Sequence, residues 1–328
     1  MPLGDVPAHA SRAERLGFDG LIVPEALTDA VLVSLLALEH TTRLHVLTGV
    51  VVAFARSPML LAQDAWALQR FSGGRFGLGL GSQIRANVEQ RYGMPWSAPA
   101  ARMRDYAGAL RAVFDAWQNG TRLNYRSDNY SLTRMQPFFD PGPLEHPEPP
   151  IWLGAVGPRM TRVAGEVADG IIAHPTNSTP DYLREVVRPE LDAGRRSAER
   201  DDSARVIANP LTATGATEAA VAEEREAARR ILAFTYSTPA YAPTLHHHGW
   251  DDVGPALRQR ARGGDWESMN ALVDDAMLDV LVPSGLYGDI AGILRERYTP
   301  VADGIAIRMP ANPAHDDGFE GVVSRIRG

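Results

Sequence analysis

Residues 151–160 read IWLGAVGPRM and combine three local signals in one short stretch. The apolar run predicts a buried strand, the small residues after it predict a tight turn, and Pro158 suits the first turn of a helix. The same succession recurs along the chain, where short apolar runs alternate with amphipathic stretches. Because these runs are apolar throughout rather than alternating, they are typical of a parallel sheet that is covered on both faces.

The apolar runs give seven predicted strands, at residues 21–24, 44–53, 76–81, 151–155, 170–173, 206–213 and 305–309. A barrel of alternating strands and helices needs eight. The missing one should precede a helix near residues 9–16, and only residues 1–5 are available for it. The predicted fold class is therefore α/β, a (β/α)8 TIM barrel whose first strand is short or missing. Residues 1–328 suit a single domain of this type.

Helices are predicted between the strands, with apolar faces that we interpret as core packing. One face carries Leu61, Ala65 and Leu68 and ends at Gly73; a second carries Met103, Leu110, Phe114 and Trp117 and ends at Gly120; a third carries Ala220, Ala227, Ile231 and Phe234. Glycine is common where a helix ends in a left-handed residue.

Two insertions interrupt this pattern. Residues 121–150 contain a predicted hairpin that turns at residues 127–129, followed by a proline-rich passage. Residues 236–285 form a second insertion, in which residues 239–285 look irregular. The insertion at residues 121–150 could cover a substrate or only decorate the surface.

Composition excludes several classes of function. The 33 Lys plus Arg against 40 Asp plus Glu give a formal net charge of -7, which argues against nucleic acid or an anionic membrane as the main partner. Cysteine is absent, which excludes disulfides, thiolate metal sites and cysteine nucleophiles. No secretory signal opens the chain, and no stretch approaches the roughly 18 apolar residues needed to cross a bilayer. We therefore expect a cytoplasmic protein.

Three glycine-containing segments suggest binding of an anion and a ring. In residues 151–160, the small Ala155 and Gly157 precede a helix whose free N–H groups could hold a phosphate, with Arg159 adding charge. The alternative for this segment is a plain strand-to-helix turn. Residues 77–82 read GLGLGS; with Ser82 in place of a third glycine a dinucleotide fingerprint is poorly matched, and a structural turn is the other interpretation. Gly49 lies inside an apolar strand, which suggests a bulge or a close backbone approach.

Together these segments resemble the luciferase-like monooxygenase superfamily, and most closely its branch of coenzyme F420-dependent oxidoreductases. The resemblance is carried by residues 48–58, 71–79, 154–160 and 168–175. It implies the luciferase-like type of TIM barrel, with a bulge in the third strand and a non-prolyl cis peptide at Gly49-Val50 that supports one face of the cofactor ring. It also implies a homodimer.

The resemblance further implies a set of cofactor-binding residues. These are Gly49, Val50, Gly81, Ser82, Ala155, Val156, Gly157, Arg159, Met160 and Thr176. One departure concerns the substrate. Relatives that oxidise a sugar phosphate have a His after the acidic residue that ends the second strand, whereas here Ala26 follows Glu25, and their later Glu has no counterpart near Gln83. Oxidation of a sugar phosphate is therefore not expected.

The resulting hypothesis is an oxidoreductase that transfers a hydride between F420 and a small, largely apolar metabolite. Alternatives are a monooxygenase that uses reduced FMN and oxygen, a non-catalytic flavin-binding barrel, and a metal-dependent hydrolase. The candidate catalytic residues are Glu25, Arg85 and His174, each of which follows a predicted strand. His246, His247 and His248 invite a metal interpretation, but three consecutive side chains point in different directions and metal sites need converging ligands. We therefore expect no metal site.

Overall fold

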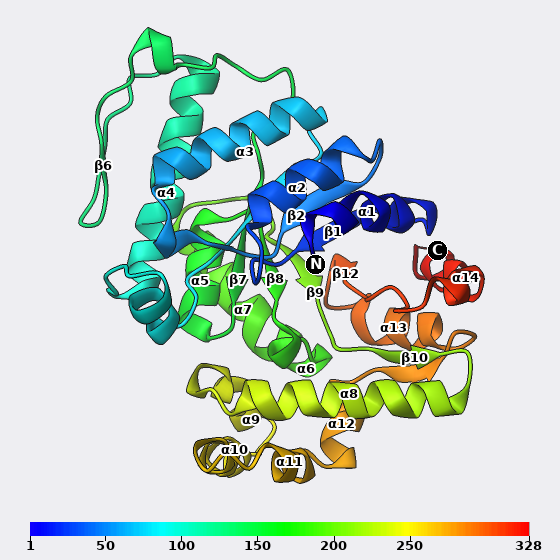
Figure 1. The fold of residues 1–328 in the computed structure, drawn as a ribbon. Coiled ribbons are helices and arrows are strands. Elements are labelled where there is room, and N and C mark those ends of the chain that lie inside the picture. The colour runs from blue at the N-terminus through cyan, green and yellow to red at the C-terminus, as the bar shows by residue number, and fades with distance from the viewer. Residues whose placement is uncertain (328) are drawn as a thin grey trace. The chain divides into compact units, whose positions relative to one another are not determined.

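The computed structural model describes residues 1–327, and its central feature is a parallel sheet (Figure 1). The strand order is β1-β2-β4-β7-β8-β9-β12, and β3 pairs with β4. These strands are β1 (Gly20–Val23), β2 (His45–Thr48), β3 (Val51–Val52), β4 (Phe76–Gly81), β7 (Ile151–Ala155), β8 (Gly170–Ala173), β9 (Arg205–Ala208) and β12 (Gly304–Ile305). The predicted α/β class with a parallel sheet is confirmed.

Two small sheets and a series of helices complete the fold. β5 (Tyr125–Arg126) pairs antiparallel with β6 (Ser131–Leu132), and β10 (Ala213–Gly215) pairs parallel with β11 (Ser284–Leu286). The α-helices are α1 (Val6–Arg15), α2 (Ala30–Glu39), α3 (Pro58–Ser72), α4 (Pro99–Asn119), α5 (Pro158–Val167), α6 (Pro180–Tyr182), α7 (Arg188–Ser197), α8 (Glu218–Tyr236), α9 (Ala242–His247), α10 (Val253–Arg262), α11 (Trp266–Met269), α12 (Asp275–Leu281), α13 (Ile290–Tyr298) and α14 (Asp316–Arg327). The 3-10 and π-helical segments are η1 (Leu3–Asp5), η2 (Ala53–Ala55), η3 (Asn87–Arg91), η4 (Pro137–Phe139), η5 (Pro175–Asn177), η6 (Leu183–Val187), η7 (Pro239–Tyr241), η8 (Asn270–Leu272) and η9 (Pro313–His315).

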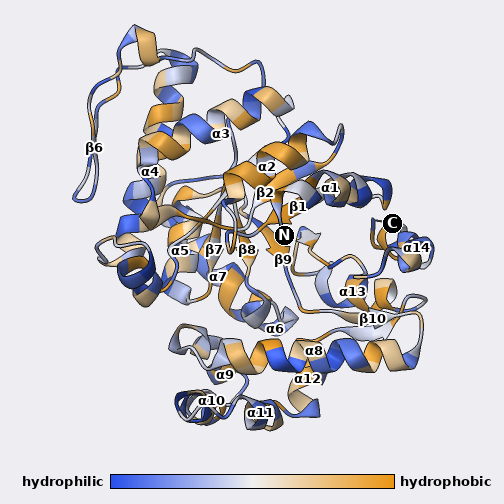
Figure 2. Ribbon diagram, in the orientation of Figure 1, coloured by the Kyte–Doolittle hydropathy of each residue, from blue (hydrophilic) through white to orange (hydrophobic). Residues whose placement is uncertain are grey.

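The chain divides into two compact units. Unit 1 comprises residues 1–154, 162–171 and 191–204, and unit 2 comprises residues 155–161, 172–190 and 205–328. In unit 1, α3 packs on α4 through Trp66, whose ring stacks on Phe114 and lies 5.4 Å from the ring of Trp117. Helix α2 is apolar along most of its length, whereas α8 alternates between apolar and polar faces (Figure 2).

Several local predictions are confirmed. Gly73 ends α3 and Gly120 ends α4, both in the left-handed region that glycine favours, with φ of 66° and 67°. Helix α5 begins at Pro158, as its sequence predicts. The hairpin turns at residues 127–129, where Ser127 N donates to Tyr130 O.

The N-terminal segment holds a short 3-10 helix, η1, rather than a strand. No strand precedes α1 among the residues that the structure describes.

Three predicted strands have the wrong extent. Residues 44–53 divide into β2 and β3, because the backbone turns at Gly49-Val50. Residues 206–213 divide into β9 and β10, because Pro210 cannot donate to a ladder, and β10 joins a different sheet. The last predicted strand, at residues 305–309, is only the two-residue β12.

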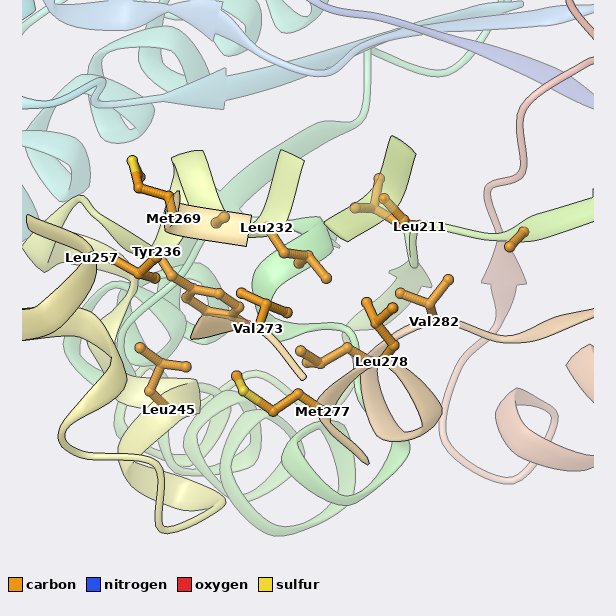
Figure 3. Close-up of a cluster of buried hydrophobic side chains, with 14 residues drawn as sticks. Leu211, Leu232, Tyr236, Leu245, Leu257, Met269, Val273, Met277, Leu278 and Val282 are labelled. Carbon is orange, nitrogen blue, oxygen red and sulfur yellow. The ribbon is translucent and has the colours of Figure 1, made fainter. Parts of the chain in front are cut away.

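The prediction that residues 239–285 are irregular is wrong. They contain α9, α10, α11 and α12, and these helices share a buried core with α8 (Figure 3). Leu232 and Tyr236 of α8 pack there with residues such as Leu245, Leu257 and Met277. The helices are short and end at glycines such as Gly249 and Gly264, both with positive φ, so the glycines mark helix ends rather than an irregular loop.

The predicted buried face of α8 is also wrong. Phe234 is 63% exposed, whereas Val221, Ala228, Leu232 and Tyr236 are buried. Alanines occur all around this helix, so its apolar periodicity does not identify one face.

Candidate functional site

In unit 1, the side chain of Val50 occupies the space that two glycines leave open. The Gly49-Val50 peptide is cis, as the resemblance implied. A Cβ placed on Gly81 would lie 2.3 Å from Val50 Cγ2, and one placed on Gly154 would lie 2.9 Å from Val50 Cγ1. Cβ atoms essentially never lie so close to another atom, so a side chain at either position would force Val50 or the backbone to move. At least part of the glycine pattern therefore serves packing within the protein.

Glu25 follows β1 and supports β3 rather than standing free. Its Oε2 accepts hydrogen bonds from Val52 N (2.7 Å) and Arg56 Nη1 (3.0 Å), and its Oε1 lies 2.7 Å from Arg56 Nη2. Arg56 also contacts Asp29 Oδ2, and Asp29 Oδ1 caps α2 by accepting from Val31 N (2.8 Å). With a side chain only 8% exposed and both oxygens occupied, Glu25 is arranged to position the backbone after Val50.

In the turn after β4, the side chains of Ser82 and Gln83 form hydrogen bonds with groups of the same turn. Ser82 Oγ donates to Gln83 O, and Gln83 Oε1 accepts from Ile84 N (2.9 Å) and Asn87 Nδ2 (3.0 Å). Gln83 adopts a φ of 59°, which is uncommon for a residue other than glycine. Arg85 is 69% exposed and pairs with Glu89 (3.0 Å). The structure does not bring Arg85 to Glu25. The catalytic role of Arg85 stays a prediction.

In unit 2, the turn after β7 is held from one side through its carbonyl groups. Asn177 Nδ2 donates to Ala155 O (2.9 Å), and Tyr182 Oη donates to Val156 O (3.2 Å). Burial raises the pKa of Tyr182 to about 12, so the hydroxyl remains a donor at neutral pH. Because the C=O and N–H of a trans peptide point in opposite directions, the N–H groups of Val156 and Gly157 face away from Asn177 and Tyr182.

The same turn leaves donors and space unused. Among residues 1–327, the N–H groups of Val156, Gly157 and Arg159 have no acceptor, and the exposed Arg159 has no ion-pair partner. A Cβ on Gly157 would meet nothing within 4 Å, and its φ lies outside the left-handed region. Neither packing nor backbone conformation requires glycine here. Met160 N and Thr161 N both donate to Gly157 O, so Gly157 caps α5 through its own carbonyl.

The segment after β8 carries the predicted residues His174 and Thr176. His174 Nδ1 lies 2.9 Å from Thr176 Oγ1 and accepts from Thr176 N (3.3 Å). Tyr236 Oη of α8 donates to Thr176 O (2.9 Å). The ring of His174 stacks on Tyr241 of η7, with centroids 4.6 Å apart and planes inclined by 22°. Burial lowers the pKa of His174 to about 4.

The three consecutive histidines have separate partners. His246 pairs with Asp251 at the surface, His247 lies 3.7 Å from Glu185, and His248 Nε2 lies 3.1 Å from Thr179 Oγ1 while its ring stacks on Trp250. In the described part of the chain, no group of three or more His, Cys, Asp or Glu side chains could hold a metal ion. Nor does any helix among residues 1–327 combine the length and apolar character needed to span a membrane.

Sequence reasoning missed the residues that hold these segments in place. Asn177 and Tyr182 hold the turn after β7, Tyr241 stacks on His174, and Arg56 pairs with Glu25. Asn177 stands just beyond the motif at residues 168–175, which was the one available signal for it.

Comparison with known proteins identifies the family. The family model described as luciferase-like monooxygenase matches residues 1–303. The chain belongs to this family. Its α/β fold, with a parallel sheet curled into a half-barrel, is that of a luciferase-like TIM barrel, and the chain is an oxidoreductase of that class.

Two of the similar proteins are named as reductases, and a third is uncharacterized. An uncharacterized protein of Mycobacterium tuberculosis is 45% identical over 308 residues, which cover 92% of this chain and 90% of that protein. A 5,10-methylenetetrahydromethanopterin reductase of Archaeoglobus fulgidus is 28% identical over 93% of this chain and 89% of its own length. The structure of the coenzyme F420-dependent tetrahydromethanopterin reductase from Methanopyrus kandleri matches with a TM-score of 0.80 and 20% identity, covering 100% of this chain and 95% of that one.

Proposed function

We propose that this protein is an F420-dependent oxidoreductase that transfers a hydride between the deazaflavin and a small, uncharged organic substrate. When bound, the deazaflavin supplies the hydride chemistry, and the protein supplies binding and orientation. The proposal includes a homodimer as the assembly. The names of the relatives support F420, because the reductase from Methanopyrus kandleri is described as dependent on that coenzyme.

The observation that carries the proposal is the turn at Val156–Met160. The main-chain N–H groups of Val156, Gly157 and Arg159 lack acceptors among residues 1–327. Gly157 is smaller than the surrounding protein requires, and Arg159 adds an exposed cation. Helix α5 contributes the positive end of its dipole at the same place. These residues fit the phosphate of a cofactor side chain.

The surroundings of Val50 lie within unit 1. Because Val50 fills the space above Gly81 and Gly154, its side chain is fixed, and the Glu25–Arg56 pair fixes the backbone that follows it. A rigid apolar side chain is suited to supporting one face of a planar ring. We propose that role for Val50.

A titration of the purified, cofactor-free protein with F420 and, separately, with FMN tests the proposal. Cofactor fluorescence should saturate with F420 at micromolar protein and should change little with FMN. Saturable binding of FMN without F420 binding would instead support the monooxygenase alternative. Tight F420 binding without turnover of any carbonyl or alcohol substrate would support a non-catalytic binding protein.

A further inference from the structure

His174 and Tyr241 form a stacked pair of rings, and each ring carries a polar atom that the protein does not use. His174 Nε2 and Tyr241 Oη make no hydrogen bond among residues 1–327, and neither is among the enclosed polar atoms that lack a partner. Neither atom is therefore fully enclosed by the protein. All the contacts considered below lie within unit 2.

The hydrogen bonds of His174 determine which nitrogen carries its proton. The main-chain N–H of Thr176 can only donate, so His174 Nδ1 must accept. The proton of the neutral ring then resides on Nε2. Since burial lowers the pKa of His174 to about 4, the ring is neutral through the physiological range. Nε2 is thus a permanent hydrogen-bond donor.

Tyr241 is a neutral donor for a related reason. Burial raises the pKa of its hydroxyl above the ordinary value, so the group stays protonated. Its ring lies parallel to that of His174 within 22°, which limits rotation of both rings. The backbone on the His174 side is fixed as well, because Tyr236 Oη holds Thr176 O and Asn177 holds Ala155 O.

We infer that the His174–Tyr241 pair binds the reacting oxygen of the substrate, and that this substrate is an uncharged carbonyl compound. The inference rests on the proposed function. A neutral imidazole N–H can polarise a carbonyl without first gaining a proton. Two neutral donors in a partly buried site offer no counter-charge, so an anionic group would lose hydration without an ion pair. Tyr241 acts here as both a donor and a positioning residue for His174.

The first test measures the tautomer on the full-length, unsubstituted protein. Long-range proton–nitrogen NMR of a sample with 15N-labelled histidine separates the two neutral tautomers from the charged ring, and loss of one signal set in His174→Gln assigns His174 among the nine histidines. The neutral tautomer with hydrogen on Nε2 should persist from pH 5.5 to 8. Hydrogen on Nδ1, or a charged ring at pH 7, would overturn the inference.

The second test uses cyclohexanone and cyclohexanecarboxylate as matched probes. Cyclohexanone should shift the His174 Nε2 signal in saturable fashion, and the carboxylate should not. Tyr241→Phe should weaken the ketone about three- to tenfold, the loss expected for one neutral hydrogen bond, and Tyr241→Leu should weaken it further. Tyr287→Phe, which removes a hydroxyl elsewhere in unit 2, is the matched control and should change nothing.

Two further outcomes would overturn the inference: an equal shift with the carboxylate, or no shift with the ketone. A shift produced by F420 alone would assign the pair to the cofactor instead. Because none of the ketone measurements needs F420, a failure of F420 binding would reject the proposed function while leaving the result for the stacked pair readable.

Discussion

Two turns in this protein follow glycine-containing strands, but different groups of each turn form hydrogen bonds. The turn after β4 follows GLGLG and continues with Ser82, and the turn after β7 follows IWLGA and continues with Val156. Both predict a close backbone approach to a ligand. In the first, the side chain of Gln83 accepts from Ile84 and Asn87. In the second, Asn177 and Tyr182 donate hydrogen bonds to the main-chain carbonyls, and the N–H groups of Val156 and Gly157 stay free.

The difference lies in where the partners come from. Gln83 supplies its own turn with hydrogen bonds, because its side-chain oxygen accepts from Ile84 N and Asn87 Nδ2. Asn177 and Tyr182 approach the second turn from one side only, and so orient its peptide groups. A glycine-rich turn therefore becomes a candidate anion site when other segments bind its carbonyls, not simply because it contains glycine.

Gly157→Asp should give the largest effect and would sharpen the comparison most. A carboxylate at the start of α5 would repel a bound phosphate, and we expect F420 affinity to fall about 100-fold, or about 2.7 kcal/mol. Because a Cβ at this position meets nothing within 4 Å, the melting temperature should not fall. Fluorescence titration and thermal unfolding measure the two quantities.

Gly288→Asp is the matched control for that variant. Gly288 also precedes a helix of unit 2, a Cβ placed on it would meet nothing within 4 Å, and its φ lies outside the left-handed region. Its replacement should leave F420 affinity unchanged. Equal losses in the two variants, or no loss in Gly157→Asp, would contradict the assignment of the turn after β7.

Gly81→Ala tests the packing role of the glycines in unit 1. The added methyl would approach Val50 Cγ2 to 2.3 Å, so the side chain or the backbone must move. We expect a loss of about 1–3 kcal/mol in the free energy of unfolding, the usual cost of overpacking. Gly157→Ala should cost nothing measurable in the same denaturation experiment. If Gly81→Ala were equally neutral, the close fit of Val50 would be disproved.

The sequence allowed the main features of the fold to be predicted because they depend on local signals. Apolar runs marked most of the strands, Pro158 marked the start of α5, and Gly73 and Gly120 marked helix ends. The residues that complete the candidate site depend on distant contacts. Tyr236 donates a hydrogen bond to Thr176, which lies 60 positions away along the chain, and the periodicity of apolar residues does not predict such a contact.

Short helices were the other failure. Residues 239–285, which were predicted to be irregular, contain many glycines and prolines, and several of these begin or end a helix of fewer than a dozen residues. The shared core with α8 stabilises these helices, because helices of this length are marginal by themselves. Tyr241 was missed for the same reason, since η7 belongs to this region.

Asn177→Ala tests whether the second turn depends on the donors behind it. The substitution leaves the carbonyl of Ala155 without its partner in a buried location, which should cost about 1–2 kcal/mol of stability. F420 affinity should also fall, by about fivefold, because the N–H groups lose their orientation. Asn119→Ala removes an exposed amide that bonds only Asp115 and is the control. Unchanged affinity in Asn177→Ala would mean that the turn is fixed without this side chain.

The smallest expected effect separates two arginines that the sequence places in similar positions after a strand. Arg159→Gln removes the exposed, unpaired cation at the start of α5 and should weaken F420 about threefold, with a weaker salt dependence of binding. Arg85 already pairs with Glu89 on an exposed surface, so Arg85→Gln should change neither F420 affinity nor its salt dependence. Titrations at low and high salt measure both. A larger loss for Arg85→Gln would reverse the comparison, since the turn after β4 would then be the one that meets the cofactor.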